Sequence, residues 1–287
     1  MESLFFSAAS GIANALVACT LKGAENSKCR IAAFGFTSMV IAASLAFGFI
    51  PMLPGAYSDA GVWISGIVIG ILMSVAIATS VLANKEGPPS LVWSMANLGL
   101  IVPIILAAIF QNEPLRITDI LLLGNFILML WMFKRGMSAA KDFFADNSPR
   151  RYAILLIAVF LSNGLLMFGF KVNEIIYPAS NKACFVGALY SGAAILFLLS
   201  GIRHGLRHLR KCELKWGLMM GISTVAAVLF LQMAMKLPAI VVFPLTQGIA
   251  LIGGVALMAL IYKERINKFK IAGIALGLAI IVQSILR

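Results

Sequence analysis

The chain has 287 residues, of which 61% are hydrophobic and only 12% are charged, and its formal net charge is +12. A soluble domain is nearer half apolar and a quarter charged, so this composition excludes an ordinary soluble protein. The apolar residues form runs of about 18 or more, which is enough for a helix to cross a bilayer. We therefore predict an all-α integral membrane protein.

In chain order, the apolar runs predict ten transmembrane helices. They are Leu4–Leu21, Ile31–Ile50, Val62–Leu82, Pro89–Phe110, Ile117–Phe133, Tyr152–Phe170, Ala183–Ser200, Trp216–Met235, Ile240–Ile261 and Phe269–Leu286. The longest break between them, Lys134–Arg151, is too short to hold a soluble domain. The mechanism must therefore lie within the membrane.

The positive charge gathers in alternate loops. The odd-numbered loops hold 18 of the Lys and Arg residues, and the other side of the membrane holds 5. Cytoplasmic loops collect Lys and Arg, so we predict that the odd-numbered loops, including the basic run 203–215, face the cytoplasm. With ten helices, both termini then face outward. This distribution indicates contact with lipid headgroups and argues against a nucleic-acid partner.

One polar pattern occurs at two distant places. The segments "NALVACTLKGAE" (14–25) and "NGLLMFGFKVNE" (163–174) lie 149 residues apart, and each places an Asn before a Lys and a Glu at the same spacing. Glu113 and Glu264, which follow the fourth and ninth predicted helices, lie 151 residues apart. The similar offsets predict an internal repeat.

The repeat divides the chain into a five-helix half at 1–133, a polar connecting loop at 134–151 and a second five-helix half at 152–287. Because five is odd, the second half must enter the membrane from the opposite side. Two inverted five-helix repeats are a transporter architecture, in which the halves rock about a site near the midplane.

With these features the chain resembles members of the drug/metabolite transporter superfamily, and in particular its EamA-like ten-span members. The resemblance rests on the two halves, on Glu113 and Glu264, and on an early glycine, Gly124 or Gly273, in the fifth and tenth helices. It implies a carrier of small metabolites, such as amino acids, sugars or amphiphilic compounds, commonly an exporter in a bacterial inner membrane. It also implies a central cavity lined by the first, third, fourth, sixth, eighth and ninth helices. Such members are often drawn with cytoplasmic termini, whereas the charge distribution predicts outward ones.

The repeated pattern places an amide deep in the membrane and a carboxylate at its surface. Eleven residues return a helix to nearly the same face, so Asn14 shares a stripe with Glu25, and Asn163 with Glu174, if each helix continues. Each Asn would lie about 16 Å deeper than its Glu. We predict that the two asparagines contact substrate and that the glutamates mark two mouths.

A lysine lies three residues before each glutamate, close enough to pair with it: Lys22 in the first copy and Lys171 in the second. The functional interpretation is a gate residue pair at each mouth. The alternative is an ion pair that anchors the helix end, with Lys extending to the interface and Asn bonding a neighbouring helix.

Further polar residues within the apolar runs are candidates for the substrate pathway: Trp93, Asn97, Tyr190, Gln232, Thr246 and Gln247. Trp93 and Asn97 are four residues apart, so an aromatic ring and an amide face one way and suit a small amphipathic solute. Pro103 and Pro244 lie well inside their helices, where each removes a backbone donor and is expected to kink the helix. Ordinary interhelical bonding and packing kinks are the alternatives.

In or at the edge of the apolar runs, three pairs of glycines are spaced four residues apart: Gly66/Gly70, Gly217/Gly221 and Gly273/Gly277. Such pairs allow helices to approach closely inside the bundle. For Gly273 and Gly277, on the last helix, the alternative is a homodimer interface.

Every carboxylate lies at or near the end of an apolar run, so tight proton coupling is disfavoured and a neutral or zwitterionic substrate is preferred. No metal-binding spacing is present, and no cofactor is expected. The chain is predicted not to be an enzyme, because the apolar runs hold no HExxH and no carboxylate pair. A membrane-embedded partner or receptor without transport activity is the remaining alternative.

Overall fold

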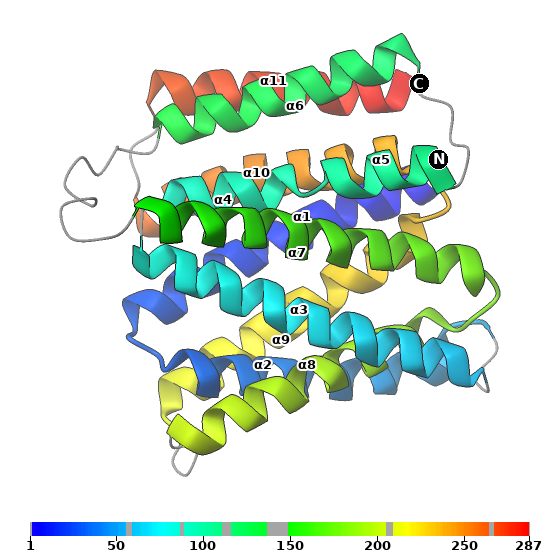
Figure 1. The fold of residues 1–287 in the computed structure, drawn as a ribbon, viewed down its shortest axis with the longest axis vertical. Helices are drawn as coiled ribbons and strands as arrows, with labels where there is room; N and C mark the ends of the chain where they lie inside the picture. Colours follow the sequence, from blue (N-terminus) through cyan, green and yellow to red (C-terminus); the bar gives the residue numbers. More distant parts are fainter. Residues whose placement is uncertain are drawn as a thin grey trace. The chain divides into compact units, whose positions relative to one another are not determined.

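The computed structural model of the chain describes residues 2–55, 59–86, 89–110, 116–136, 149–204, 209–263 and 267–286. Every regular element among these residues is helical (Figure 1). The elements are α1 (Glu2–Asn26), α2 (Ile31–Phe49), a short 3₁₀ turn η1 (Ile50–Met52), α3 (Ala60–Glu86), α4 (Pro89–Leu98), α5 (Ile101–Phe110), α6 (Ile117–Gly136), α7 (Pro149–Ile176), α8 (Lys182–His204), α9 (Lys211–Ala234), α10 (Ala239–Tyr262) and α11 (Lys268–Leu286).

The hydropathy of these helices makes the chain a multi-pass membrane protein. Within the described residues, eight helices are long and apolar enough to span a membrane, and two shorter apolar helices cover Ser94–Phe110 and Ile117–Met132. Large apolar side chains remain uncovered, such as Ile117 and Leu260, which are 80% and 77% exposed. Such surfaces suit lipid tails, which are as apolar as the side chains themselves.

Most helices extend beyond the apolar run that predicts them. Helix α1 continues to Asn26, and α7 begins at Pro149 and continues to Ile176. Proline suits the first helical position, where the backbone N–H would have no partner within the helix. Helices α1 and α7 each run unbroken from the Asn to the Glu of the repeated pattern, as the predicted shared stripe requires.

The fourth predicted helix is divided into α4 and α5 by a turn at Gly99 and Leu100. Proline cannot donate a backbone hydrogen bond and crowds the carbonyl four residues earlier, which for Pro103 is that of Gly99. The amide of Val102 donates to this carbonyl instead, at 3.0 Å. In contrast, α10 runs through Pro244 without a break in its assignment.

The chain forms two compact units, each built from helices that lie before and after the connecting loop. Unit 1 comprises Met1–Ser74 and Val172–Lys236, and unit 2 comprises Val75–Lys171 and Leu237–Arg287. In unit 1, α1 packs along α9, and α2 packs along α8 and α9. In unit 2, α6 packs along α11, and α10 contacts α5, α6 and α11. Helices α3 and α7 contribute residues to both units.

Glycine pairs allow two close helix contacts in unit 1. A Cβ on Gly66 would lie 2.6 Å from the Cβ of Ala188 on α8, and one on Gly70 would meet the carbonyl of Leu189. A Cβ at either position therefore requires the two helices to separate. The predicted packing role of this pair within the bundle is confirmed.

The second pair, Gly217 and Gly221 on α9, packs in the same way against α2. A Cβ on Gly217 would lie 2.9 Å from Thr37 Cγ2, and one on Gly221 would lie 2.8 Å from Ile41 Cγ2. In unit 2, a Cβ on Gly277 would lie 2.6 Å from Ile252 Cδ1 on α10. Gly277 is thus covered by a helix of its own chain, and the homodimer stays a prediction.

Candidate functional site

The first copy of the repeated pattern ends in an exposed ion pair. Lys22 Nζ lies 3.2 Å from Glu25 Oε2, as the spacing predicts, and the glutamate side chain is 72% exposed. Between them, Gly23 packs directly against the ring of Trp216, whose Nε1 donates to Ser27 Oγ at 2.8 Å. The glycine therefore lets α1 lie close to α9, while the charged pair stays outside the contact.

The second copy ends in a buried polar cluster. Glu174 pairs with Lys182, which follows the end of α7, and their side chains are only 8% and 13% exposed. The neighbouring Asn173 is also buried, and its Oδ1 accepts a hydrogen bond from Ser65 Oγ on α3 at 3.0 Å. The charged pair of the second copy is thus buried, whereas that of the first is exposed.

Lys171 lies in the other unit from Glu174, and its Nζ donates to the carbonyl of Leu237 at 2.8 Å. The pairing of Lys171 with Glu174 therefore stays a prediction. The carbonyl contact ties the end of α7 to the connection before α10, so this buried lysine has a structural partner within unit 2.

The two asparagines of the pattern are both half-buried. Asn163 Nδ2 donates to the carbonyl of Val159, one turn earlier in the same helix, at 2.9 Å. Because this bond uses only one donor, the amide oxygen and second hydrogen keep their bonding capacity. Contact of Asn14 and Asn163 with substrate stays a prediction.

Two other predicted pathway residues in unit 1 have opposite surroundings. Tyr190 is fully buried, and its hydroxyl lies 2.8 Å from the carbonyl and 3.0 Å from the hydroxyl of Thr224. Gln232 is also fully buried, but neither polar atom of its side chain has a hydrogen-bond partner among the described residues. Tyr190 therefore joins α8 to α9, whereas Gln232 contributes no such link.

In unit 2, Asn97 and Thr246 are buried, and Gln247 is half-buried. Trp93 lies on α4, and its side chain is outside the described residues. The predicted pathway residues are therefore divided between the two compact units. Unit 1 holds Asn14, Lys22, Glu25, Glu174, Tyr190 and Gln232, and unit 2 holds Trp93, Asn97, Asn163, Lys171, Thr246 and Gln247. Glu113 and Glu264 lie outside the described residues.

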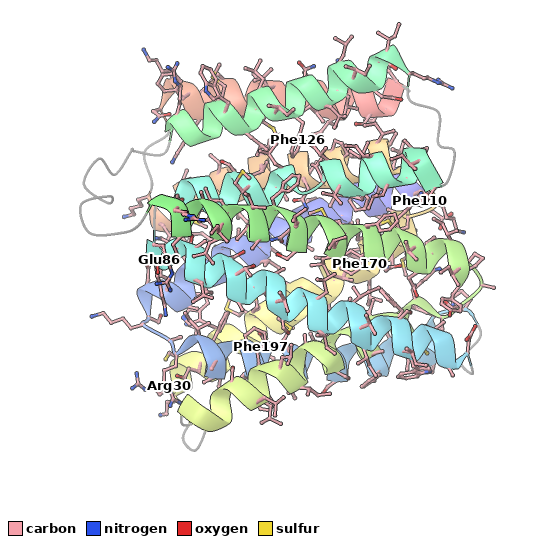
Figure 2. The ribbon with its side chains drawn as sticks, viewed as in Figure 1. Arg30, Glu86, Phe110, Phe126, Phe170 and Phe197 are labelled. Atoms are coloured by element: carbon pink, nitrogen blue, oxygen red, sulfur yellow. The ribbon has the colours of Figure 1, made fainter. Side chains whose placement is uncertain are left out.

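Sequence reasoning missed an ion pair at the α1–α2 connection. Arg30, which is labelled in Figure 2, makes a two-pronged contact with Glu213 in the first turn of α9, at 2.7 and 2.9 Å. The Glu213 side chain is fully buried. Glu213 also accepts the backbone N–H of Arg210 at 2.9 Å. The sequence did hold one indication of this ion pair. Glu213 is the single carboxylate in the strongly basic run 203–215, so many cationic side chains could pair with it.

In the connection between α7 and α8, a neutral residue makes a corresponding link, to the backbone that follows α2. Asn181 Nδ2 donates to the carbonyls of Ile50 and Leu53, at 3.0 and 2.6 Å, while its Oδ1 accepts the N–H of Ala183 at 2.9 Å. Asparagine is a favoured residue immediately before a helix, so this cap was predictable, although its distant partners were not.

The thiol of Cys29, which precedes Arg30 in the chain, also has a shifted pKa. Burial and a hydrogen bond with Cys212 raise the pKa of Cys29 to about 11. The hydrogen bond to Glu213 raises the pKa of Arg30 above its usual value. Cys29 therefore remains a thiol at neutral pH, and only the thiolate is a nucleophile or a metal ligand. Within the described residues, no cluster of three or more His, Cys, Asp and Glu residues could hold a metal ion.

Comparisons with known proteins identify the fold and not the activity. No family model matches the chain, and no curated protein matches it. A solved structure described only as "Crystal structure of protein" is similar, with a TM-score of 0.76 and 15% sequence identity. The match covers 98% of this chain and 98% of that chain. The fold therefore exists in an experimental structure over nearly the full length.

Proposed function

We propose that this protein is a secondary transporter of a small metabolite and works by alternating access. The substrate is neutral or zwitterionic, such as an amino acid or a sugar, or an amphiphilic compound, and the direction is export. The protein belongs with the EamA-like drug/metabolite transporters and lies in a bacterial inner membrane with its basic odd-numbered loops in the cytoplasm.

The observation that carries this proposal is the reciprocal glycine packing in unit 1. Gly66 and Gly70 lie on the third helix of the first half and pack on α8, the second long helix of the second half. Gly217 and Gly221, each 151 residues later, pack on α2, the second helix of the first half. A two-fold relation between inverted halves produces this exchange of contacts, and transporters use such repeats for alternating access.

Further support comes from helices that occupy equivalent places in the two halves. The second helices, α2 and α8, pack together, and so do the last helices, α6 and α11. Pairing of an element with its own counterpart is expected close to a two-fold axis. The Arg30 and Asn181 links, which lie 151 residues apart, have the same relation.

Two buried carboxylates, those of Glu174 and Glu213, favour a neutral substrate. Glu174 is paired with Lys182, and Glu213 with Arg30. A carboxylate held in this way offers little charge to a cationic solute, because its cation is already in place.

Uptake into proteoliposomes tests the proposal. Vesicles containing the purified protein should take up at least one radiolabelled neutral or zwitterionic metabolite faster than protein-free vesicles, and the rate should saturate. Absence of uptake across a broad panel, with protein that is folded in the vesicles, would favour a partner or receptor protein without transport activity.

A further inference from the structure

Gln232, near the end of α9, has two buried polar atoms without partners. Its side chain is fully buried, and no hydrogen-bonding group in the described part of the chain reaches its Nε2 or its Oε1. The large majority of buried side-chain polar atoms in native proteins are hydrogen-bonded. An amide that lacks partners for both its donor and its acceptor therefore requires an explanation.

The seam between α1 and α9 does not supply a partner. Phe6 and Phe230 stack there with ring centroids 6.1 Å apart. Ser10 Oγ donates its hydrogen to the carbonyl of Ala227 at 2.7 Å, so this hydroxyl proton is already used. The neighbours Leu229 and Leu231 are buried and apolar.

Gln283 on α11 shows the usual arrangement for a glutamine in a long apolar helix. Its Oε1 accepts a hydrogen bond from Asn125 Nδ2 on α6 at 3.0 Å. This pair joins two helices of the same unit and has a clear structural role. Gln232 has the same side chain in a similar helix but makes no such link, so no interhelical hydrogen bond accounts for its polar atoms.

Gln232 lies close to a point at which the chain passes from one compact unit to the other. Gln232 precedes by a few residues the point at which the chain passes from unit 1 to unit 2, after Lys236. Asn173, whose Nδ2 is buried and also unpartnered in the described chain, lies next to another of the three such points, the one in α7. In a carrier that works by alternating access, segments of this kind meet different groups as the cycle proceeds.

We propose that Gln232 binds the substrate through its side-chain amide. The substrate presents a hydrogen-bond donor and a hydrogen-bond acceptor side by side, as a neutral primary amide does. Nε2 donates to the carbonyl oxygen of the solute, and Oε1 accepts its N–H. A simple cation or anion satisfies only one of these two atoms, so the site selects neutral hydrogen-bonding groups. This inference rests on the proposed transport function and adds the chemical class of the solute.

The state of Gln232 is tested first without any solute. We compare the melting temperatures of purified wild-type protein, Gln232→Leu and Gln283→Leu. Leucine removes two unpaired atoms at position 232 but breaks a hydrogen bond at position 283. The melting temperature should stay unchanged or rise by about 2–4 °C for Gln232→Leu and should fall for Gln283→Leu. A fall for Gln232→Leu as large as for Gln283→Leu would show that Gln232 has a protein partner and would overturn the proposal.

The substrate class is tested with L-glutamine and L-methionine, which have similar side-chain lengths but differ in the amide. Millimolar L-glutamine should raise the melting temperature of the wild type and of Gln283→Leu, and this shift should be lost in Gln232→Leu. L-Methionine should stabilise Gln232→Leu at least as well as the wild type. A wild type that does not respond to L-glutamine, or a Gln232→Leu variant that keeps the response, would overturn the proposal.

Neither measurement requires flux, so the two hypotheses can fail separately. Absence of uptake by proteoliposomes, with the L-glutamine response intact, would refute transport and leave recognition by Gln232 in place. Saturable uptake combined with a fully stable, L-glutamine-responsive Gln232→Leu variant would refute recognition and leave transport in place.

Discussion

The ends of α1 and α7 carry the same Asn, Lys and Glu spacing, yet one end is exposed and the other is buried. Glu25 pairs with Lys22 on the surface, whereas Glu174 and Lys182 are almost fully covered. The difference lies in the residues between the Lys and the Glu. The first copy has small residues that admit Trp216, and the second has Asn173, which bonds to Ser65. Spacing thus sets which face of a helix a residue occupies, and the intervening residues decide whether that face is covered.

The largest difference between the two ends is expected for their glutamates. Glu174→Ala leaves the Lys182 ammonium buried without its carboxylate, which should destabilise the protein by about 3 kcal/mol. The melting temperature in detergent should then fall by about 6 °C or more. A change no larger than that of the matched variant Glu25→Ala would show that the two ends are equivalent and would break the comparison.

Gly23→Ala tests the close packing of α1 against α9 at the first copy of the pattern. The new methyl group would collide with the Trp216 ring, which is held by its bond to Ser27. Overpacking of this kind should cost about 2 kcal/mol in unfolding free energy. Gly124→Ala is the control, because no other atom lies within 4 Å of its added Cβ. Equal thermal stability of the two variants would contradict the close contact between α1 and α9.

Ser65→Ala tests the contribution of the amide in the second copy. Loss of the hydroxyl leaves Asn173 Oδ1 buried without this donor, which should cost about 1 kcal/mol. Ser44→Ala is the control, because its hydroxyl bonds only within its own exposed turn, to the carbonyl of Val40. Thermal unfolding should show a shift for Ser65→Ala alone. If both variants match the wild type, the Asn173 bond adds nothing to stability.

The smallest effect is expected for the exposed pair itself. Glu25→Gln removes a surface salt bridge, which typically contributes about 0–1 kcal/mol and is weakened by salt. The melting temperature should change by about 2 °C or less, and the difference should vanish in high salt. A large effect that persists in high salt would mean that Glu25 is covered in the folded protein.

The sequence predicted the elements well because the signal for a membrane helix is local. Long apolar runs identified the helices, and the spacing of three residues predicted the Lys22–Glu25 pair. The division of the fourth helix was harder to foresee. Pro103 alone indicated a kink, but the combination with a glycine four residues earlier produced a full turn. Pro244 differs from Pro103 in this respect, because the residue four positions earlier is Ile240 and α10 continues through the proline.

The contacts of the candidate site could not be predicted from the sequence, because the residues that make them are distant from one another along the chain. Arg30 and Glu213 are separated by 183 residues, and Asn181 bonds to carbonyls more than 120 residues away. Lys182 is only eight residues from Glu174, but it lies past the end of α7, where helical periodicity no longer predicts which side chains meet. Whether Gln232 would find a partner depended on which helix faced it, and no sequence pattern specifies that.

Substrate counterflow in proteoliposomes tests the central claim most directly. Vesicles are loaded with an unlabelled solute that the protein takes up, and entry of the labelled form is then followed against empty vesicles. A carrier that alternates between two faces should return with bound solute, so internal loading should accelerate labelled entry several-fold, with a transient overshoot. An entry rate that is independent of internal solute, or no entry at all, would contradict alternating access by this protein.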